Sequence, residues 1–259
     1  MFKYLTGPLA VVVLAGAAPT DRDDRAKQLF DLMEQKVTAG KSVECAFEIK
    51  ADLSEGRGPT VTLDLEGFLA VADGNRARLE IRERTAARPP FHLVVSDGQR
   101  WWWHDKGSPP HLVNKSPGAN LASDYRTSFA RAGVFLPTLP LPPVEAAGPK
   151  DRFPVSGFRL GPKERVGTRD AQRVDYDLFV KGQTQPNGGP MPFPVQLWLD
   201  AETSMPVKRV VTQKLVDGAG KALTGMVITE TYRKAVSGGA IDPKTFEVPK
   251  ATGETIVEP

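Results

Sequence analysis

The sequence is poor in the residues from which most metal and disulfide sites are built. Its 259 residues include one cysteine and three histidines. A single cysteine cannot form an intramolecular disulfide, and a zinc site needs three or four ligands at a defined spacing. The charge is nearly balanced, with 34 basic and 31 acidic side chains, so no basic excess points to nucleic acid. We therefore expect no metal, no cofactor and no nucleic-acid partner.

Two groups of polar residues have the side chains that a catalytic or metal site would use. His104 and Asp105 with His111 form a sparse set of metal ligands, but a turn separates them and no glutamate motif follows. Ser96, His104 and Asp105 are the residue types of a nucleophilic triad, yet adjacent side chains on a strand point to opposite faces. We predict that the protein is not an enzyme, and that Cys45 is a small buried residue of a strand.

Long apolar runs are absent beyond the N-terminus. The run Leu9–Ala18 follows Lys3 and ends in small residues. It has about half of the roughly 20 apolar residues that a membrane-spanning helix needs, and its layout is typical of an export signal. A buried N-terminal helix is the alternative. We predict a signal peptide at 1–18, one domain at 19–259 without a transmembrane segment, and a soluble periplasmic protein.

Glycine and proline are frequent, with 24 and 23 residues respectively, as expected where turns join many short strands. Asp97-Gly98 lies between two β-prone runs and predicts a hairpin with a two-residue turn. That turn would pair Leu93 with Trp102 and Val94 with Trp101. Because the strand carries three consecutive tryptophans, which alternate between its faces, both faces of the sheet need an apolar partner.

A second hairpin is predicted for strands 60–71 and 76–84. A three-residue loop at 73–75 pairs residue i with residue 148 − i, which matches apolar with apolar and acid with base. The predicted pairs are Leu69–Leu79, Gly67–Ile81, Glu66–Arg82 and Asp64–Arg84. The arginine row of the second strand (Arg76, Arg78, Arg82 and Arg84) is then a solvated face neutralised across the sheet, and an anion-binding patch is the alternative.

Two helices and further strands complete the predicted order. Apolar residues at helical spacing predict a helix over 21–39, with Ala26, Leu29, Phe30, Met33 and Val37 on one face. Ser116-Pro117 begins a second helix that ends at Gly133, with Leu121, Tyr125, Phe129 and Ala132 on its apolar stripe. A proline-rich connection follows at 137–149. The other strands are predicted at 43–53, 111–114, 155–160, 172–180, 195–200, 206–216 and 223–233.

About eleven strands that curve under two helices can leave an apolar pocket. An acyl chain gains about 0.8 kcal/mol per buried CH₂, so a chain of about 16 carbons contributes on the order of 10 kcal/mol before the costs of binding. The same alternating pattern is equally typical of an ordinary packed core.

Three motifs in order resemble a known family. They are the hairpin 95–103, with Ser96-Asp97-Gly98 before its aromatic residues, the segment Leu197–Val207 and the ending Ile241–Pro249. The chain is similar to the LolA/LolB-like superfamily of periplasmic lipoprotein carriers. The resemblance implies a mainly β (α+β) fold, an open, curved antiparallel half-barrel of about eleven strands with helices covering the concave face. Relative to a carrier, the chain is longer by about the segments 137–149 and 185–194.

The resemblance also implies a function. The concave face would bind the acyl chains of a lipid or lipoprotein without catalysis, including lipoproteins sorted to the outer membrane. An envelope-stress sensor that binds an envelope protein partner on the same scaffold is the alternative. The implied ligand-binding residues are Phe47, Ile49, Leu63, Leu65, Leu79, Ile81, Leu93, Trp102, Leu197 and Leu199 from the strands, and Leu29, Phe30, Met33, Tyr125 and Phe129 from the helices.

Overall fold

The computed structural model describes most of the chain outside the N-terminus and the middle. It covers residues 21–55, 60–72, 76–84, 92–105, 111–113, 154–185, 188–216, 222–248 and 255–257. The predicted signal peptide, the predicted second helix with Tyr125 and Phe129, and the proline-rich segment 137–149 lie outside these residues. They remain predictions.

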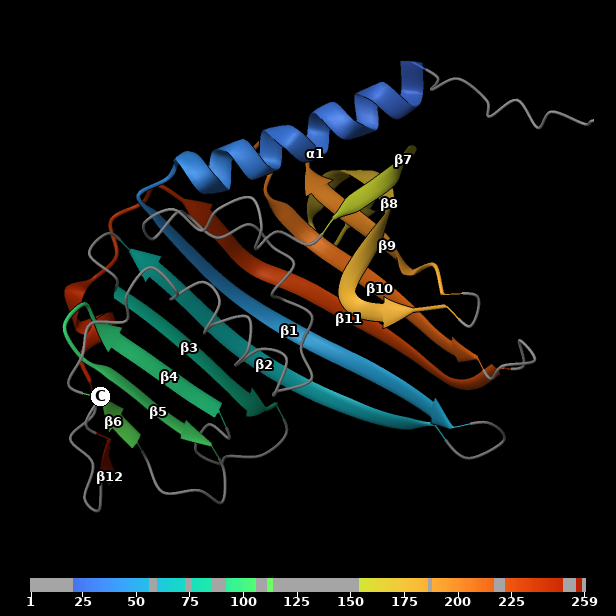
Figure 1. Ribbon diagram of the computed structural model, residues 1–259. Coiled ribbons are helices and arrows are strands. Elements are labelled where there is room, and N and C mark those ends of the chain that lie inside the picture. The colour runs from blue at the N-terminus through green and yellow to red at the C-terminus, as the bar shows by residue number, and fades with distance from the viewer. Residues whose placement is uncertain are drawn as a thin grey trace, which may run out of the picture.

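The strands form one continuous twelve-stranded sheet (Figure 1). Its order is β12-β6-β5-β4-β3-β2-β1-β11-β10-β9-β8-β7, and every pair is antiparallel except β12 with β6. The bounds are β1 Ser42–Glu55, β2 Val61–Ala72, β3 Arg76–Glu83, β4 His92–Asp97, β5 Trp101–Asp105, β6 His111–Val113, β7 Val155–Val166, β8 Arg169–Thr184, β9 Pro190–Asp200, β10 Pro206–Val216, β11 Ala222–Ser237 and β12 Thr255–Val257.

The sheet is built from two meanders that meet along β1 and β11. Strands β1 to β6 run outward in one direction and β11 to β7 in the other, so β12 and β7 are the free edges and the sheet stays open. This confirms the mainly β, open and curved half-barrel. The three-residue strand β12 was not predicted. Strands β7 and β8 extend beyond the predicted 155–160 and 172–180, because Gly167 (φ 61°) permits a tight turn between them.

Helix α1 (Asp21–Ala39) has the predicted bounds. Three aspartates in its first turn complement the positive end of the helix dipole. The predicted stripe faces inward, since Ala26, Phe30, Met33 and Val37 are buried and Leu29 packs partly buried against the same core. The helix lies along one end of the sheet and packs mainly on β7 and β8 (Figure 1).

The predicted pairing of β2 with β3 is confirmed. Leu69 pairs with Leu79, Gly67 with Ile81 and Glu66 with Arg82. Arg82 Nε lies 3.1 Å from Glu66 Oε1, and Arg84 Nη2 lies 2.8 Å from Asp64 Oδ2. Arg82 and Arg84 are therefore paired with carboxylates across the sheet, as the solvated-face interpretation predicts. Arg78 pairs with Glu80 of its own strand, and Arg76 lies over the Phe246 ring.

The predicted register of the tryptophan hairpin is wrong by two residues. Leu93 pairs with His104 and Val95 with Trp102, which centres the turn one residue later, on Gly98-Gln99. Asp97 sets this turn, because its Oδ1 accepts hydrogen bonds from the backbone N–H groups of Gln99 (2.9 Å) and Arg100 (2.7 Å). Positive φ is then needed at Gly98 (97°), and Gln99 does not adopt it. A shift of two residues leaves every side chain on its own face.

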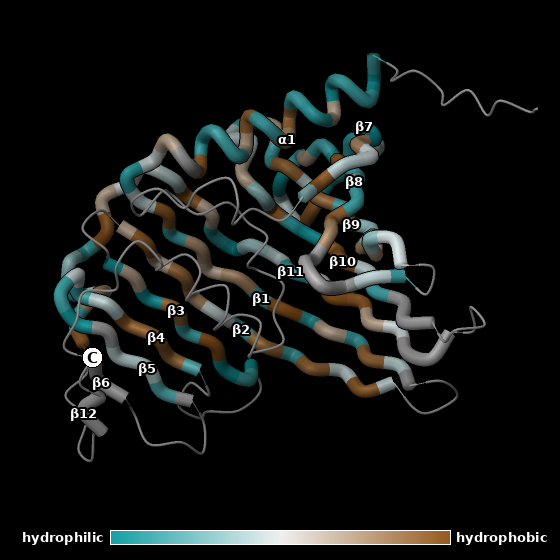
Figure 2. The backbone as a smooth tube through the Cα atoms, viewed as in Figure 1, coloured by the Kyte–Doolittle hydropathy of each residue, from teal (hydrophilic) through white to brown (hydrophobic). Residues whose placement is uncertain are grey.

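Both faces of the sheet carry an apolar layer. Figure 2 shows apolar and polar residues alternating along strands β1 to β5. The inner, concave face holds the main core, which extends from β4 across β1 to β8 and includes α1. On the outer face the 3₁₀ helix η3 (Pro243–Phe246) buries Phe246 against Ala70 and Ala72, and Val248 packs on a cluster that includes Trp102. Trp103 packs against the inner core, which confirms that the tryptophans need partners on both faces.

Candidate functional site

The strand register brings most of the predicted ligand-binding residues together on the concave face. Ile49 pairs with Leu65, and Leu69 of the same face pairs with Leu79. Leu197 pairs with Val174 on the other meander. Nine of the predicted residues belong to one buried core, each at most 6% exposed: Phe47, Ile49, Leu65, Leu79, Ile81, Leu197, Leu199, Phe30 and Met33. Leu29 packs partly buried against them.

Leu93 and Trp102 do not lie on the concave face. They form an outer-face cluster with Val95, against which Val248 packs. The inner residue of that part of β4 is Val94, which pairs with Leu79. The resemblance did not distinguish the inner from the outer face of β4, because both faces of this strand are apolar and its sequence shows no polar–apolar alternation. Tyr125 and Phe129 lie outside the described residues.

The concave face is closed in this conformation. Leu79, Ile81 and Leu197 are 0% exposed, so a water-sized sphere cannot reach them. An acyl chain could contact these side chains only by displacing the groups that pack on them. The site is thus an apolar surface that is already packed, and a guest has to compete with that packing.

One end of this apolar surface is open to solvent. Along β2, the residues of the inner face become exposed toward the start of the strand: Leu65 is 6% exposed, Leu63 44% and Val61 55%. Leu63 lies opposite Ala51, and Val61 lies opposite the half-buried Leu53. We call Val61 and Leu63 the apolar lip. It joins solvent to the buried concave face without a polar interruption along β2.

A buried polar cluster interrupts the concave face on β8, β10 and β11. Arg209 and Glu230 are both 0% exposed. Arg209 donates to Glu230 from Nε (2.7 Å) and Nη2 (2.9 Å), and the Tyr232 hydroxyl donates to Glu230 Oε2 at 2.6 Å. Arg209 also donates to the Tyr176 hydroxyl. We call these four residues the buried polar cluster.

Burial and neighbouring charges shift the pKa values of Arg209, Tyr176 and Tyr232. Burial alone would lower the pKa of Arg209, but Glu230, Tyr232 and Tyr176 together outweigh it and raise the pKa above its usual range. Burial raises the pKa of Tyr176 to about 12 and that of Tyr232 well above its ordinary value. Arg209 and Glu230 form an ion pair at 2.7 Å and the two tyrosine hydroxyls stay neutral, so the charges of the cluster balance.

Helix α1 is fastened over this half of the concave face. Phe30 packs against the rings of Phe158 and Tyr176, with centroids 5.2 and 5.0 Å away. The C-terminal end of the helix is held by Lys36, whose Nζ donates to Thr203 O at 2.7 Å and whose carbonyl accepts from Ser237 Oγ at 2.7 Å. These contacts make α1 a fixed cover for β7 and β8.

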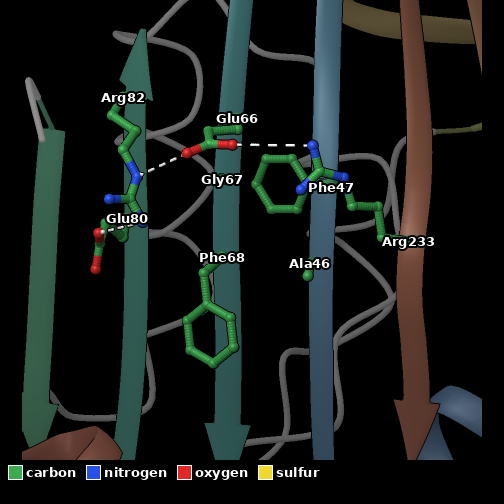
Figure 3. Close-up of a pocket in the computed structure, with 8 residues that line it drawn as sticks. All are labelled: Ala46, Phe47, Glu66, Gly67, Phe68, Glu80, Arg82 and Arg233. Atoms are coloured by element: carbon green, nitrogen blue, oxygen red, sulfur yellow. Dashed lines mark ion pairs between the residues drawn. The ribbon is translucent and has the colours of Figure 1, made fainter. Parts of the chain in front are cut away.

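A polar pocket of about 310 Å³ opens on the sheet near the β-bulge of β1 and β11 (Figure 3). Arg82 and Arg233 reach toward Glu66 from opposite sides, and Glu80 pairs with Arg82 (Figure 3). Its two cations and two anions balance and pair with one another, so it exerts no net attraction on a charged ligand. The lining residues are Ala46, Phe47, Glu66, Gly67, Phe68, Glu80, Arg82 and Arg233.

Of the polar residues considered for catalysis or metal binding, Ser96 and His104 have described side chains, whereas the side chains of Asp105 and His111 lie outside the described part of the chain. No group of three or more potential metal ligands occurs within the described residues. Ser96 pairs with Trp101, three positions beyond the pair of His104 with Leu93. Ser96 Oγ instead accepts a hydrogen bond from the Gly98 N–H at 3.2 Å, within the turn. Among the described helices, none is long and apolar enough to cross a membrane.

Comparisons with known proteins give weak likenesses. No family model matches the sequence, and no relative was found among curated proteins. Similar solved structures include a LolA superfamily protein from Nitrosomonas europaea (10% identity, 86% of this chain and 97% of that one, TM-score 0.33). The lipoprotein LppX from Mycobacterium tuberculosis is 10% identical over 84% of this chain and 100% of its own, with a TM-score of 0.40.

A third similar structure is the MucA/MucB complex of Pseudomonas aeruginosa, with 15% identity, 87% of this chain and 61% of that chain covered, and a TM-score of 0.36. The names include the superfamily that the sequence resembles. Likenesses at these identities and TM-scores carry no inference about a ligand or a partner. Proposals for this chain therefore rest on its own residues.

Proposed function

We propose that this protein is an exported, periplasmic protein that binds the acyl chains of a lipid or lipoprotein on its concave face, without catalysis. The observation that carries the proposal is the apolar surface that runs along β2 from solvent at Val61 and Leu63 to the buried Leu65. The two lip residues are neighbours on the inner face, so an apolar ligand could contact them first and pass from them to the buried surface.

The gain from burying an acyl chain is large enough to compete with the packing of the face. Each buried CH₂ contributes about 0.8 kcal/mol, so about 16 carbons offer on the order of 10 kcal/mol. Opening a packed face uses part of this gain, and loss of the ligand's freedom uses more. The wall of the proposed site is the inner face of the sheet from β3 through β1, β11 and β10 to β9 and the adjoining β8, and the predicted second helix, with Tyr125 and Phe129, is proposed as part of its cover.

Matched surface variants test the role of the apolar lip. Leu63→Ser changes an inner-face residue that is 44% exposed, and Val236→Ser changes a residue of β11 that is 42% exposed and lies outside the lip. Both should cost little stability. We expect Leu63→Ser to slow the uptake of 1-palmitoylglycerol severalfold. Uptake is measured by the displacement of the apolar fluorophore N-phenyl-1-naphthylamine from the delipidated protein. Val236→Ser should match the wild type.

Two results would count against the proposal. A delipidated protein that takes up neither the fluorophore nor 1-palmitoylglycerol binds no acyl chain. Equal uptake by Leu63→Ser and the wild type would remove the lip from the entry route. In the first case, recovery of one stoichiometric envelope protein with the chain would favour the regulatory alternative. Sorting of lipoproteins to the outer membrane is a finer proposal, and it requires transfer of a bound lipoprotein to a second protein.

A further inference from the structure

The buried polar cluster lies within the proposed acyl site. Glu230 pairs with Ile49 of β1, and Arg209 pairs with Leu197 of β9. Both neighbours are among the predicted ligand-binding residues of the concave face. An acyl chain that lies along this face therefore has to pass beside the cluster. This inference rests on the proposed function and concerns the polar end of the cargo.

Apolar side chains of similar volume could fill the space that the buried polar cluster occupies. A buried ion pair is commonly no more stabilising than well-packed apolar residues of similar volume, because both charges lose their hydration. Here the Glu230 carboxylate is satisfied by three donors, two from Arg209 and one from Tyr232. The Tyr176 hydroxyl accepts from Arg209, and a hydroxyl that accepts a hydrogen bond keeps its own proton to donate.

We propose that the buried polar cluster recognises the carbonyl oxygen of a neutral acyl ester or amide, with the Tyr176 hydroxyl as the donor. Arg209 orients that hydroxyl by donating to its oxygen, and Glu230 and Tyr232 fix Arg209. Tyr176 is the specificity-determining residue, and the other three are positioning residues.

The charge balance of the cluster favours a neutral carbonyl over a free carboxylate. Arg209 is already neutralised by Glu230, at 2.7 Å. A fatty-acid carboxylate would enter as an unpaired charge in a buried site and lose its hydration without compensation. The cargo chemistry that fits is an acyl glycerol ester or an N-acyl group.

A matched pair of ligands tests the proposal. 1-Palmitoylglycerol and 1-O-hexadecylglycerol have the same chain length and head group, but only the first has a carbonyl. We expect the ester to displace N-phenyl-1-naphthylamine from the wild type about fivefold more tightly than the ether, which is the range of one neutral hydrogen bond. Palmitate should bind more weakly than the ester.

Tyr176→Phe removes the hydroxyl and keeps the ring that packs on Phe30 and Phe158. We expect it to bind the fluorophore as the wild type does and to lose the preference for the ester. The double variant Arg209→Met/Glu230→Leu should lose the same preference, and it provides the test should Tyr176→Phe fail to fold. Equal affinity for ester and ether in the wild type, or a preference that survives both substitutions, would overturn the inference. Absence of any binding would overturn the proposed function instead.

Discussion

Removing one partner of the buried ion pair should be far more damaging than removing both. Glu230→Leu leaves Arg209, 0% exposed, without its carboxylate. The charged guanidinium then has neither water nor a counter-ion. Arg209→Met/Glu230→Leu removes both charges and replaces them with apolar side chains of similar length.

The size of the effect follows from the burial of both groups. Breaking a buried pair costs about 3–5 kcal/mol, whereas replacing it with apolar residues is often neutral or stabilising. For a protein of this size, 1 kcal/mol corresponds to roughly 2–4 °C in Tm. We expect Glu230→Leu to lower Tm by about 6–20 °C. The double variant should lie within about 2 kcal/mol of the wild type, including the cost of leaving the Tyr232 hydroxyl without its acceptor.

Thermal and urea unfolding, followed by circular dichroism, measure both values. Arg209→Met completes the double-mutant cycle and gives the coupling energy between the two side chains. We expect a coupling of at least about 3 kcal/mol. A Glu230→Leu variant as stable as the wild type would refute the reasoning, since it would mean that water reaches Arg209. A double variant as unstable as Glu230→Leu would show that the cost comes from packing.

Three further predictions follow from local contacts. Gly67→Ala should destabilise the fold by about 1–3 kcal/mol or more in a urea titration, because a Cβ there would lie 2.2 Å from the buried Phe47 ring. Gly239→Ala is the control and should be tolerated in the same titration, because the nearest atom to its Cβ would be 3.5 Å away. Burial opposes ionisation of Asp97, but hydrogen bonds from the backbone and from Arg100 outweigh it and lower the pKa of Asp97. The contribution of Asp97 to the stability of the fold should therefore be complete above about pH 3.9 and fall away as the pH drops through the lowered pKa. An Asp97→Asn variant whose acid unfolding curve matches that of the wild type would contradict this. Burial, with Glu44 and Glu230, raises the pKa of Cys45 to about 12, so the thiol should resist Ellman's reagent at pH 8 in the native protein and react at once in urea.

Features fixed by neighbouring residues could be predicted from the sequence. The apolar stripe and the acidic first turn define α1 without reference to the rest of the chain. The β2–β3 register follows from a short loop and complementary pairs, such as Glu66 with Arg82. The tryptophan hairpin shows the limit of this approach. Its turn is set by the Asp97 side chain, whose hydrogen bonds to the following backbone N–H groups compete with the turn that Asp97-Gly98 favours.

The buried polar cluster could not be found in the sequence. Lys208 and Arg209 are followed by Val210 and Val211. Because side chains alternate between the two faces of a strand, each face of β10 carries one charge and one valine, and the pattern does not say which face is buried. Glu230, the partner of Arg209, lies 21 residues away on the next strand. Only the pairing of β10 with β11 brings the two charges together. The placement of Leu93 and Trp102 failed for a related reason, because both faces of β4 are covered by apolar groups.

Binding at the inner face of the sheet can be measured directly with the protein's own tryptophans. A brominated acyl chain quenches only tryptophans that it contacts, and the protein has Trp103 packed on the inner core and Trp198 in an outer-face cluster. Two variants, each retaining one of these tryptophans and phenylalanine at the other three positions, should be titrated with a glycerol ester of dibromostearic acid. We expect quenching of Trp103 and unchanged emission from Trp198, because only Trp103 packs on the inner core. Bound ester that leaves Trp103 unquenched, or that quenches both equally, would contradict binding at the inner face.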